Sequence, residues 1–239
     1  MLGELVRFAI KNSNSNSFIE GNLVISDNPI RIVVFAHGSG SSKNSKRNQL
    51  VSEKLNKNNI ATLLFDLLSD EEQAFDSRLE KMTSKIPGVV LNKFNISLLT
   101  KRLSSATDWV LSNSHTKKLQ LSFFASSTGG AAALMAASRY NIVSIVIRSG
   151  RTDLVENQFL EQMVSPCLFI VGSREKSLIK ISKETMKKMR NLKEKKHRII
   201  EGASHLFEEE GTMQSVAEVA TQWVTRHFTS RVNTNSIGK

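Results

Sequence analysis

The stretch Ala125-Ser126-Ser127-Thr128-Gly129 follows an apolar run at residues 119–124 and precedes a run of small residues at 130–137. A strand that stops at small-x-Ser-x-small and continues into a helix has the layout of a nucleophile elbow, where a strained turn exposes the serine hydroxyl above the sheet. The positions two before and two after the serine must be small, because the turn presses them against neighbouring backbone. Ser127 satisfies this rule, whereas Ser126 would place Phe124 at one of these positions. The sequence therefore predicts Ser127 as a nucleophile, with a close-packed Gly/Ala helix start as the alternative.

The rest of the chain alternates short apolar, β-branched runs with helical patterns, which is typical of a mostly parallel sheet with helices on both faces. With 239 residues, we expect a single α/β domain over residues 1–228 and a polar tail at 229–239. Residues 66–94 are less regular and form the predicted cap or lid. Strands are expected at about 4–11, 17–25, 32–36, 61–65, 119–124, 142–147, 167–171 and 198–200, and helices at about 45–58, 95–113, 153–162, 180–198 and 212–228.

Composition narrows the class of protein. The single cysteine, Cys167, excludes an internal disulfide framework and fits a reducing compartment, and its apolar neighbours predict a buried structural thiol. The N-terminus lacks an uninterrupted apolar segment of the kind found in signal peptides, and no apolar run approaches the length of a membrane span. We therefore expect a soluble, cytoplasmic protein without a membrane partner.

The net charge of +11 suggests a nucleic-acid partner, but the charge is concentrated in one segment. Residues 180–198 contain nine basic and two acidic side chains, so this segment holds +7 of the total. Apolar residues recur in it at helical spacing, which predicts the solvated face of one amphipathic helix. No aromatic side chain interleaves with the lysines to stack on bases. We therefore expect no nucleic-acid partner.

A serine nucleophile needs a base, usually a histidine oriented by a carboxylate. In α/β-hydrolases these groups follow the serine in the order acid, then histidine, each in a loop after a strand. His205 fits the base, since it follows the strand near residue 200 and precedes the last helix. Glu175 follows the strand at 167–171 and is the first candidate for the acid. Asp153, after the preceding strand, is the alternative, and it could equally be the N-cap of the next helix.

The oxyanion of an acyl-transfer intermediate needs backbone N–H donors. The first donor is expected from Thr128, directly after the nucleophile. The second should come from the Gly/Ser-rich loop after the strand at 32–36, from either Gly38 or Ser39. This loop lacks the Gly-Lys-Ser/Thr ending of a P-loop and the spacing of a dinucleotide fingerprint, so we do not interpret it as a phosphate cradle.

Three arginines lie near strand ends on the expected active-site side and are candidates for holding an anionic group of the substrate. They are Arg47, Arg148 and Arg151. A role in the solvated surface is the alternative for each of them.

With these residues in place, the chain resembles the dienelactone-hydrolase-like branch of the α/β-hydrolases, including the version fused to phosphoribosyltransferases. The resemblance covers roughly residues 5–228, with markers at 35–42, 47–48, 62–68, 125–129 and 202–209. It implies Ser127, Glu175 and His205 as a catalytic triad. The chain departs from the family pattern by Ala125 for the usual glycine and by Glu175 for Asp. The best-known members use a cysteine nucleophile, so dienelactone itself is not the expected substrate.

These observations predict a serine hydrolase of carboxylesterase or dienelactone-hydrolase-like type, acting on a small ester, thioester or related acyl substrate. We expect no cofactor and no metal, and a monomer or homodimer. Two other classes stay open at this point. One is a non-catalytic binding or regulatory protein on the same fold, since a fold does not fix chemistry. The other is an acyltransferase, in which an alcohol replaces water.

Overall fold

The computed structural model of the chain describes residues 3–10, 18–82, 89–192 and 194–227. One eight-stranded sheet has the order β1-β2-β4-β3-β5-β6-β7-β8. The first two strands and the β2–β4 pair are antiparallel, and all other neighbours are parallel. The strands are β1 (Glu4–Ala9), β2 (Phe18–Val24), β3 (Arg31–Ala36), β4 (Ala61–Phe65), β5 (Gln120–Ser126), β6 (Ser144–Arg148), β7 (Cys167–Gly172) and β8 (Lys195–Ile200). The predicted α/β class with a mostly parallel sheet is confirmed.

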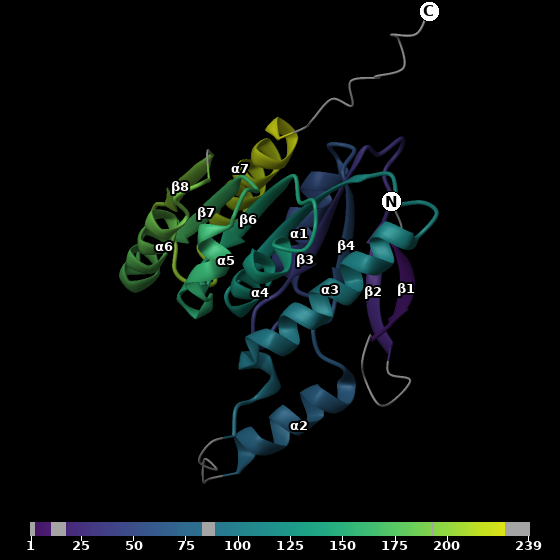
Figure 1. Cartoon of the computed structure of the whole chain (residues 1–239), viewed down its shortest axis with the longest axis horizontal. Coiled ribbons are helices and arrows are strands. Elements are labelled where there is room, and N and C mark those ends of the chain that lie inside the picture. Colours follow the sequence, from purple (N-terminus) through teal and green to yellow (C-terminus); the bar gives the residue numbers. More distant parts are fainter. Residues whose placement is uncertain (1–2, 11–17, 83–88, 193, 228–239) are drawn as a thin grey trace, which may run out of the picture.

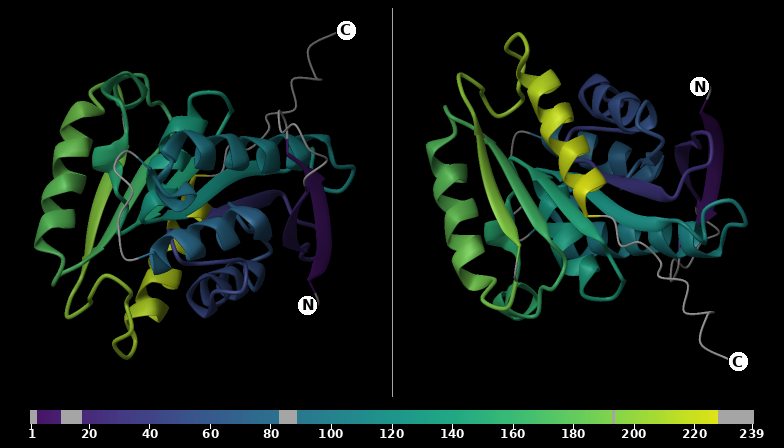
Figure 2. Two further views of the ribbon diagram at one scale, coloured as in Figure 1. Left: turned by 90° about the horizontal axis from the view of Figure 1, so that it is seen from below. Right: turned by 90° about the horizontal axis from the view of Figure 1, so that it is seen from above.

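Helices cover both faces of this sheet (Figures 1 and 2). Helices α1 (Lys46–Asn56) and α7 (Thr212–Arg226) pack together on one face, against a core that includes Phe124 and Val146. The other face is covered by α3 (Ile96–Ser112), α4 (Thr128–Ala137), α5 (Asn157–Glu161) and α6 (Lys176–Lys188). Because side chains alternate along a strand, successive residues of β5 and β6 feed these two cores in turn.

The central strands are buried along nearly their whole length, as expected for parallel strands covered on both faces. The carboxyl ends of β3, β5, β6, β7 and β8 meet at one edge of the sheet, and the loops that follow them gather there. Every residue predicted for the catalytic centre lies on one of these loops or at the helix start that follows it. The fold therefore brings the candidates to a common edge.

Three predictions about local structure are wrong. Residues within the supposedly irregular 66–94 segment form helix α2 (Asp70–Lys81), which begins with a capping box between Ser69 and Glu72. The basic segment is not one helix over 180–198, because α6 ends at Lys188 and β8 begins at Lys195. The helix expected at 153–162 is divided into a 3₁₀ turn, η2 (Thr152–Leu154), and the short helix α5. The predicted tail at 229–239 lies outside the described residues.

Candidate active site

Ser127 occupies the turn between β5 and α4 and has backbone angles of φ 48° and ψ −124°. L-residues rarely adopt this conformation, which stores strain when the surroundings hold it in place. Backbone hydrogen bonds to the end of β6 and the loop after it do so here. The N–H of Ser127 donates to the carbonyl of Arg148 at 3.2 Å, and its carbonyl accepts from the N–H of Arg151 at 2.9 Å. Ser127 keeps part of its surface exposed, whereas Ser126 is 4% exposed.

Two glycines let neighbouring backbone approach this turn. A Cβ added at Gly129 would lie 2.2 Å from the carbonyl oxygen of Ala36, so the start of α4 could not pack against the end of β3 with a larger residue. A Cβ added at Gly38 would lie 2.6 Å from the Cβ of Ser127. The loop after β3 and the elbow are therefore in direct backbone contact, which the small-residue rule at position 129 anticipated.

His205 lies on the loop between β8 and α7, and Glu175 lies directly before α6 at the end of the β7 loop. Their side chains are in contact, with 3.1 Å between His205 Nδ1 and Glu175 Oε2. A carboxylate at Nδ1 favours the tautomer that carries its proton there, which leaves Nε2 free to accept one. Among the described residues, no hydrogen bond joins Ser127 Oγ to His205. Such bonds are often long in unliganded enzymes and shorten when substrate binds.

The alternative acid, Asp153, lies within η2 and accepts hydrogen bonds from the guanidinium of Arg151, the shortest at 2.8 Å. This guanidinium lowers the pKa of Asp153. The predicted N-cap role is wrong, since Arg151 precedes η2 and Glu156 precedes α5. The same ion pair engages the guanidinium of Arg151, one of the three arginines predicted as substrate ligands.

The loop after β3 contains the candidates for the second oxyanion donor. The N–H of Ser39 points at the elbow, where it donates to Thr128 Oγ1 at 3.0 Å. The carbonyl of Gly38 belongs to the same peptide group and points the opposite way, as a trans peptide requires, to His37 Nδ1 at 2.9 Å. The N–H of Gly38 belongs to the preceding peptide. The orientation of the 38–39 peptide thus directs the Ser39 donor toward Thr128.

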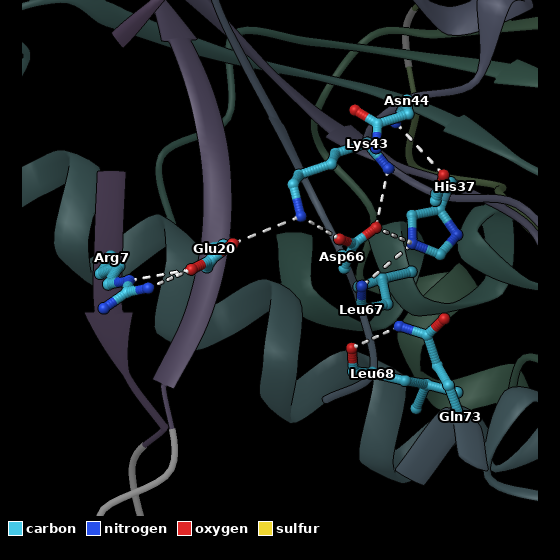
Figure 3. A network of polar contacts seen from close by, with 10 residues as sticks. Arg7, Glu20, His37, Lys43, Asn44, Asp66, Leu67, Leu68 and Gln73 are labelled. Carbon is cyan, nitrogen blue, oxygen red and sulfur yellow. Dashed lines mark hydrogen bonds and ion pairs between the residues drawn. The ribbon is translucent and has the colours of Figure 1, made fainter. Parts of the chain in front are cut away.

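His37 is a residue whose role the sequence did not reveal. Its Nε2 accepts a hydrogen bond from the N–H of Leu67 at 3.0 Å (Figure 3). The ring proton is therefore on Nδ1 and is donated to the carbonyl of Gly38. Burial lowers the pKa of His37, which favours this neutral ring. Asp66 lies 3.9 Å away and is bound to Lys43 at 2.7 Å, through both the side chain and the backbone N–H of the lysine. The network fixes the loop that contains Ser39 and Gly38.

A cavity of about 350 Å³ opens beside the elbow. Its walls are the loop at 37–42, Thr128, the leucines at 67, 68 and 99, and one side of α2. Contacts of two acidic side chains hold α2 in position. Asp76 accepts the backbone N–H groups of Asn92 and Lys93 at 2.8 and 2.9 Å, and Glu72 pairs with Arg102 of α3 at 2.5 Å. Part of the predicted cap segment therefore forms a wall of the cavity, and its action as a lid stays a prediction.

Within the described ranges, no group of three or more His, Cys, Asp or Glu side chains is arranged to hold a metal ion. Cys167 is fully buried in β7, and burial raises the pKa of its thiol. None of the helices in the same ranges has the length and apolar character needed to cross a membrane.

Comparison with known proteins places the fold of the chain among the α/β-hydrolases. A dienelactone hydrolase structure from Anabaena variabilis is 36% identical to the chain, with a TM-score of 0.84 over 95% of this chain and 98% of that one. Est1E from Butyrivibrio proteoclasticus (13% identity, TM-score 0.72, 93% and 98% coverage) and an α/β serine hydrolase from Xanthomonas campestris (11%, 0.67, 96% and 97%) share the fold.

Among curated proteins, the chain matches a Mycobacterium tuberculosis protein that carries the name phosphoribosyl transferase, found in two strains. The two sequences are 38% identical over 212 residues, which is 88% of this chain. The chain spans 44% of the length of these relatives. No family model matches the chain.

Proposed function

Because the chain belongs to the dienelactone-hydrolase-like family of α/β-hydrolases, we propose that it is a serine hydrolase that cleaves a small ester, thioester or related acyl substrate. The observation that carries this proposal is the backbone of Ser127, held at φ 48° and ψ −124° at the carboxyl edge of the sheet. Strain of this kind costs about 1–3 kcal/mol and clusters at active sites and ligand clamps. Its place between a strand and a helix, with a His–Glu pair later in the chain, supports acyl transfer over a purely structural turn.

In the proposed reaction, Ser127 Oγ attacks the substrate carbonyl while His205 Nε2 takes its proton. The tetrahedral intermediate collapses, and His205 returns the proton to the leaving alcohol or thiol. Water then attacks the acyl-enzyme, His205 again moves the proton, and the acid is released with Ser127 restored. Glu175 orients His205 and stabilises its charged form, a role that the 3.1 Å contact supports over one for the Arg151-bound Asp153.

The oxyanion would be held by the backbone N–H groups of Thr128 and Ser39. Thr128 supplies the N–H that follows the nucleophile, at the positive end of helix α4. The Ser39 N–H, which points at the elbow, is the second donor in this proposal, and the oxyanion would replace Thr128 Oγ1 as its acceptor. The loss of one such donor typically lowers the rate by about 10²–10³-fold.

The cavity beside the elbow supports a small substrate. Its volume of about 350 Å³ lies at the lower end of the range for small-molecule sites. Leucines form the apolar part of its wall. Glu80 and Lys93, which form an ion pair, also line the cavity. A short acyl chain would bury against the leucines, whereas a long one would reach this ion pair. We therefore expect activity to fall as the acyl chain lengthens.

The proposal is tested with 4-nitrophenyl esters of increasing acyl length and two serine variants. Ser127→Ala should abolish hydrolysis of the acetate, whereas Ser126→Ala, which changes the neighbouring buried serine, should retain most of it. Circular dichroism confirms that both variants are folded. Equal losses in the two variants would contradict the elbow assignment, and full activity of Ser127→Ala would contradict the proposed mechanism.

A further inference from the structure

Arg148 is the last residue of β6, and its side chain lies on the face of the sheet covered by α1 and α7. It is 6% exposed. The guanidinium lies 5.6 Å from the centre of the Phe207 ring, and Nη1 is 3.5 Å from the sulfur of Met213 in α7. A thioether is a weak acceptor, and an aromatic face attracts a cation without accepting its N–H groups in full. The charge of Arg148 is therefore buried in largely apolar surroundings.

Among the described residues, Arg148 has no acidic partner and its buried Nε has no hydrogen-bond partner. Leaving a buried charge unpaired is expensive, and folded proteins usually avoid it. Burial, followed by the neighbouring charge of Arg47, lowers the pKa of Arg148 to about 10. The side chain nevertheless stays protonated at neutral pH. An uncompensated cation at this edge of the sheet calls for an anion that the residues described by the structure do not supply.

Arg47 adds a second cation from the first turn of α1. Its Nε is also buried without a partner, and its only acidic neighbour in the described ranges is the exposed Glu208, at 3.6 Å. Arg151, in contrast, makes short hydrogen bonds to Asp153, so its charge already has an acidic partner. The structure thus separates the three arginines predicted from the sequence into a pair without adequate counter-charge and one that is neutralised.

Both of these arginines contact the loop that contains the proposed base. Phe207 and Glu208 follow His205 by two and three residues, and Met213 lies at the start of α7. On the other side, the backbone carbonyl of Arg148 accepts the N–H of Ser127. The cavity lined by α2 involves none of these loop residues. The two guanidinium groups therefore lie on the His205 side of the elbow, away from that cavity.

We propose that Arg148 and Arg47 form a subsite for an anionic group of the substrate, a carboxylate or a phosphate, on the His205 side of Ser127. This inference rests on the proposed hydrolase function and specifies its substrate class. The anion would accept hydrogen bonds from the guanidinium groups and offset the two charges. Two charge-assisted bonds of this type are worth a large factor in binding, since each is about twice as strong as a neutral one.

The first test measures binding without turnover. Thermal unfolding of Ser127→Ala is followed as succinate or inorganic phosphate is added, with sodium chloride at equal ionic strength as the reference. One of the two anions should raise the melting temperature, and its identity distinguishes carboxylate from phosphate. The rise should disappear when Arg148→Gln is added to the same background. It should persist with Arg139→Gln, an equal change of charge on an exposed residue beyond the end of α4.

The second test compares 4-acetoxybenzoate with the neutral 4-acetoxybenzamide, and a 4-nitrophenyl hemisuccinate with 4-nitrophenyl valerate. Arg148→Gln should lower kcat/KM for the anionic member of one pair by about 10–100-fold more than for its neutral partner. Equal losses on both members would make Arg148 a positioning residue for the His205 loop and overturn the subsite. The subsite would also be overturned if the anion raised the melting temperature of Ser127→Ala equally with and without Arg148→Gln. If the wild type cleaves none of these esters, the proposed function fails, and the titration of Ser127→Ala alone decides the subsite.

Discussion

Replacement of Ser127 by glycine should remove the nucleophile and yet stabilise the fold. The serine holds φ 48° and ψ −124°, a conformation that costs an L-residue about 1–3 kcal/mol and glycine almost nothing. The greater conformational freedom of glycine in the unfolded chain offsets about 0.4–1 kcal/mol of this stabilisation. A net increase of about 1 kcal/mol in the free energy of unfolding remains. For a chain of this size, it corresponds to a rise of about 2–4 °C in melting temperature.

The matched control is Ser127→Ala, which also lacks the hydroxyl but keeps the Cβ and therefore the strain. Urea unfolding and calorimetry of both variants at pH 7.5 measure the difference directly. Both should be inactive, and only the glycine variant should gain stability over the wild type. If Ser127→Gly is no more stable than Ser127→Ala, the turn is not strained and the elbow argument is refuted.

Three further predictions concern the surroundings of the serine. Glu175→Gln should lower kcat by about 10³–10⁴-fold with the fold intact. Asp153→Asn should lower activity little and the free energy of unfolding by less than about 1 kcal/mol. The reverse ranking in ester kinetics would assign the role of the acid to Asp153. Because burial lowers the pKa of His37 below 6.5, the unfolded chain binds this proton first on acidification. The free energy of unfolding should therefore fall below pH 6.5, by at most about 1.4 kcal/mol per pH unit, and urea titrations should show a smaller slope in His37→Gln. Gly129→Ala would place a Cβ 2.2 Å from the Ala36 carbonyl and should destabilise the protein by about 1–3 kcal/mol, and wild-type stability in calorimetry would contradict that packing.

The sheet and most of its helices could be predicted because their signals are local. Short apolar runs between helical patterns mark the strands, and the elbow follows a steric rule that involves only five consecutive residues. Helix α2 also has a local signal in the sequence, since Ser69 and Glu72 have the spacing of a capping box. The basic segment misled the prediction because its lysines keep a helical spacing past Lys188, where pairing with β7 imposes a strand on residues 195–200 instead.

The candidate site was harder to predict, because it depends on contacts between distant segments. Chain order selected His205 and Glu175, but their contact at 3.1 Å arises only when β7 and β8 lie side by side. From the sequence alone, Arg148 and Arg151 are equal candidates for substrate ligands. Their difference comes from three-dimensional surroundings, since one is buried against Phe207 and the other reaches an aspartate two residues away. The hydrogen bond that His37 accepts from the N–H of Leu67 depends in the same way on β3 and β4 being neighbours.

The central claim, that Ser127 is a nucleophile activated by the fold, is tested most directly by covalent labelling. The folded chain is incubated with a fluorophosphonate at pH 7.5, digested, and mapped by mass spectrometry. We predict a single phosphonyl adduct on Ser127, which is absent in Ser127→Ala, retained in Ser126→Ala and slowed by several orders of magnitude in His205→Ala. An adduct on another residue, or no adduct on a wild-type chain shown to be folded, would contradict the account.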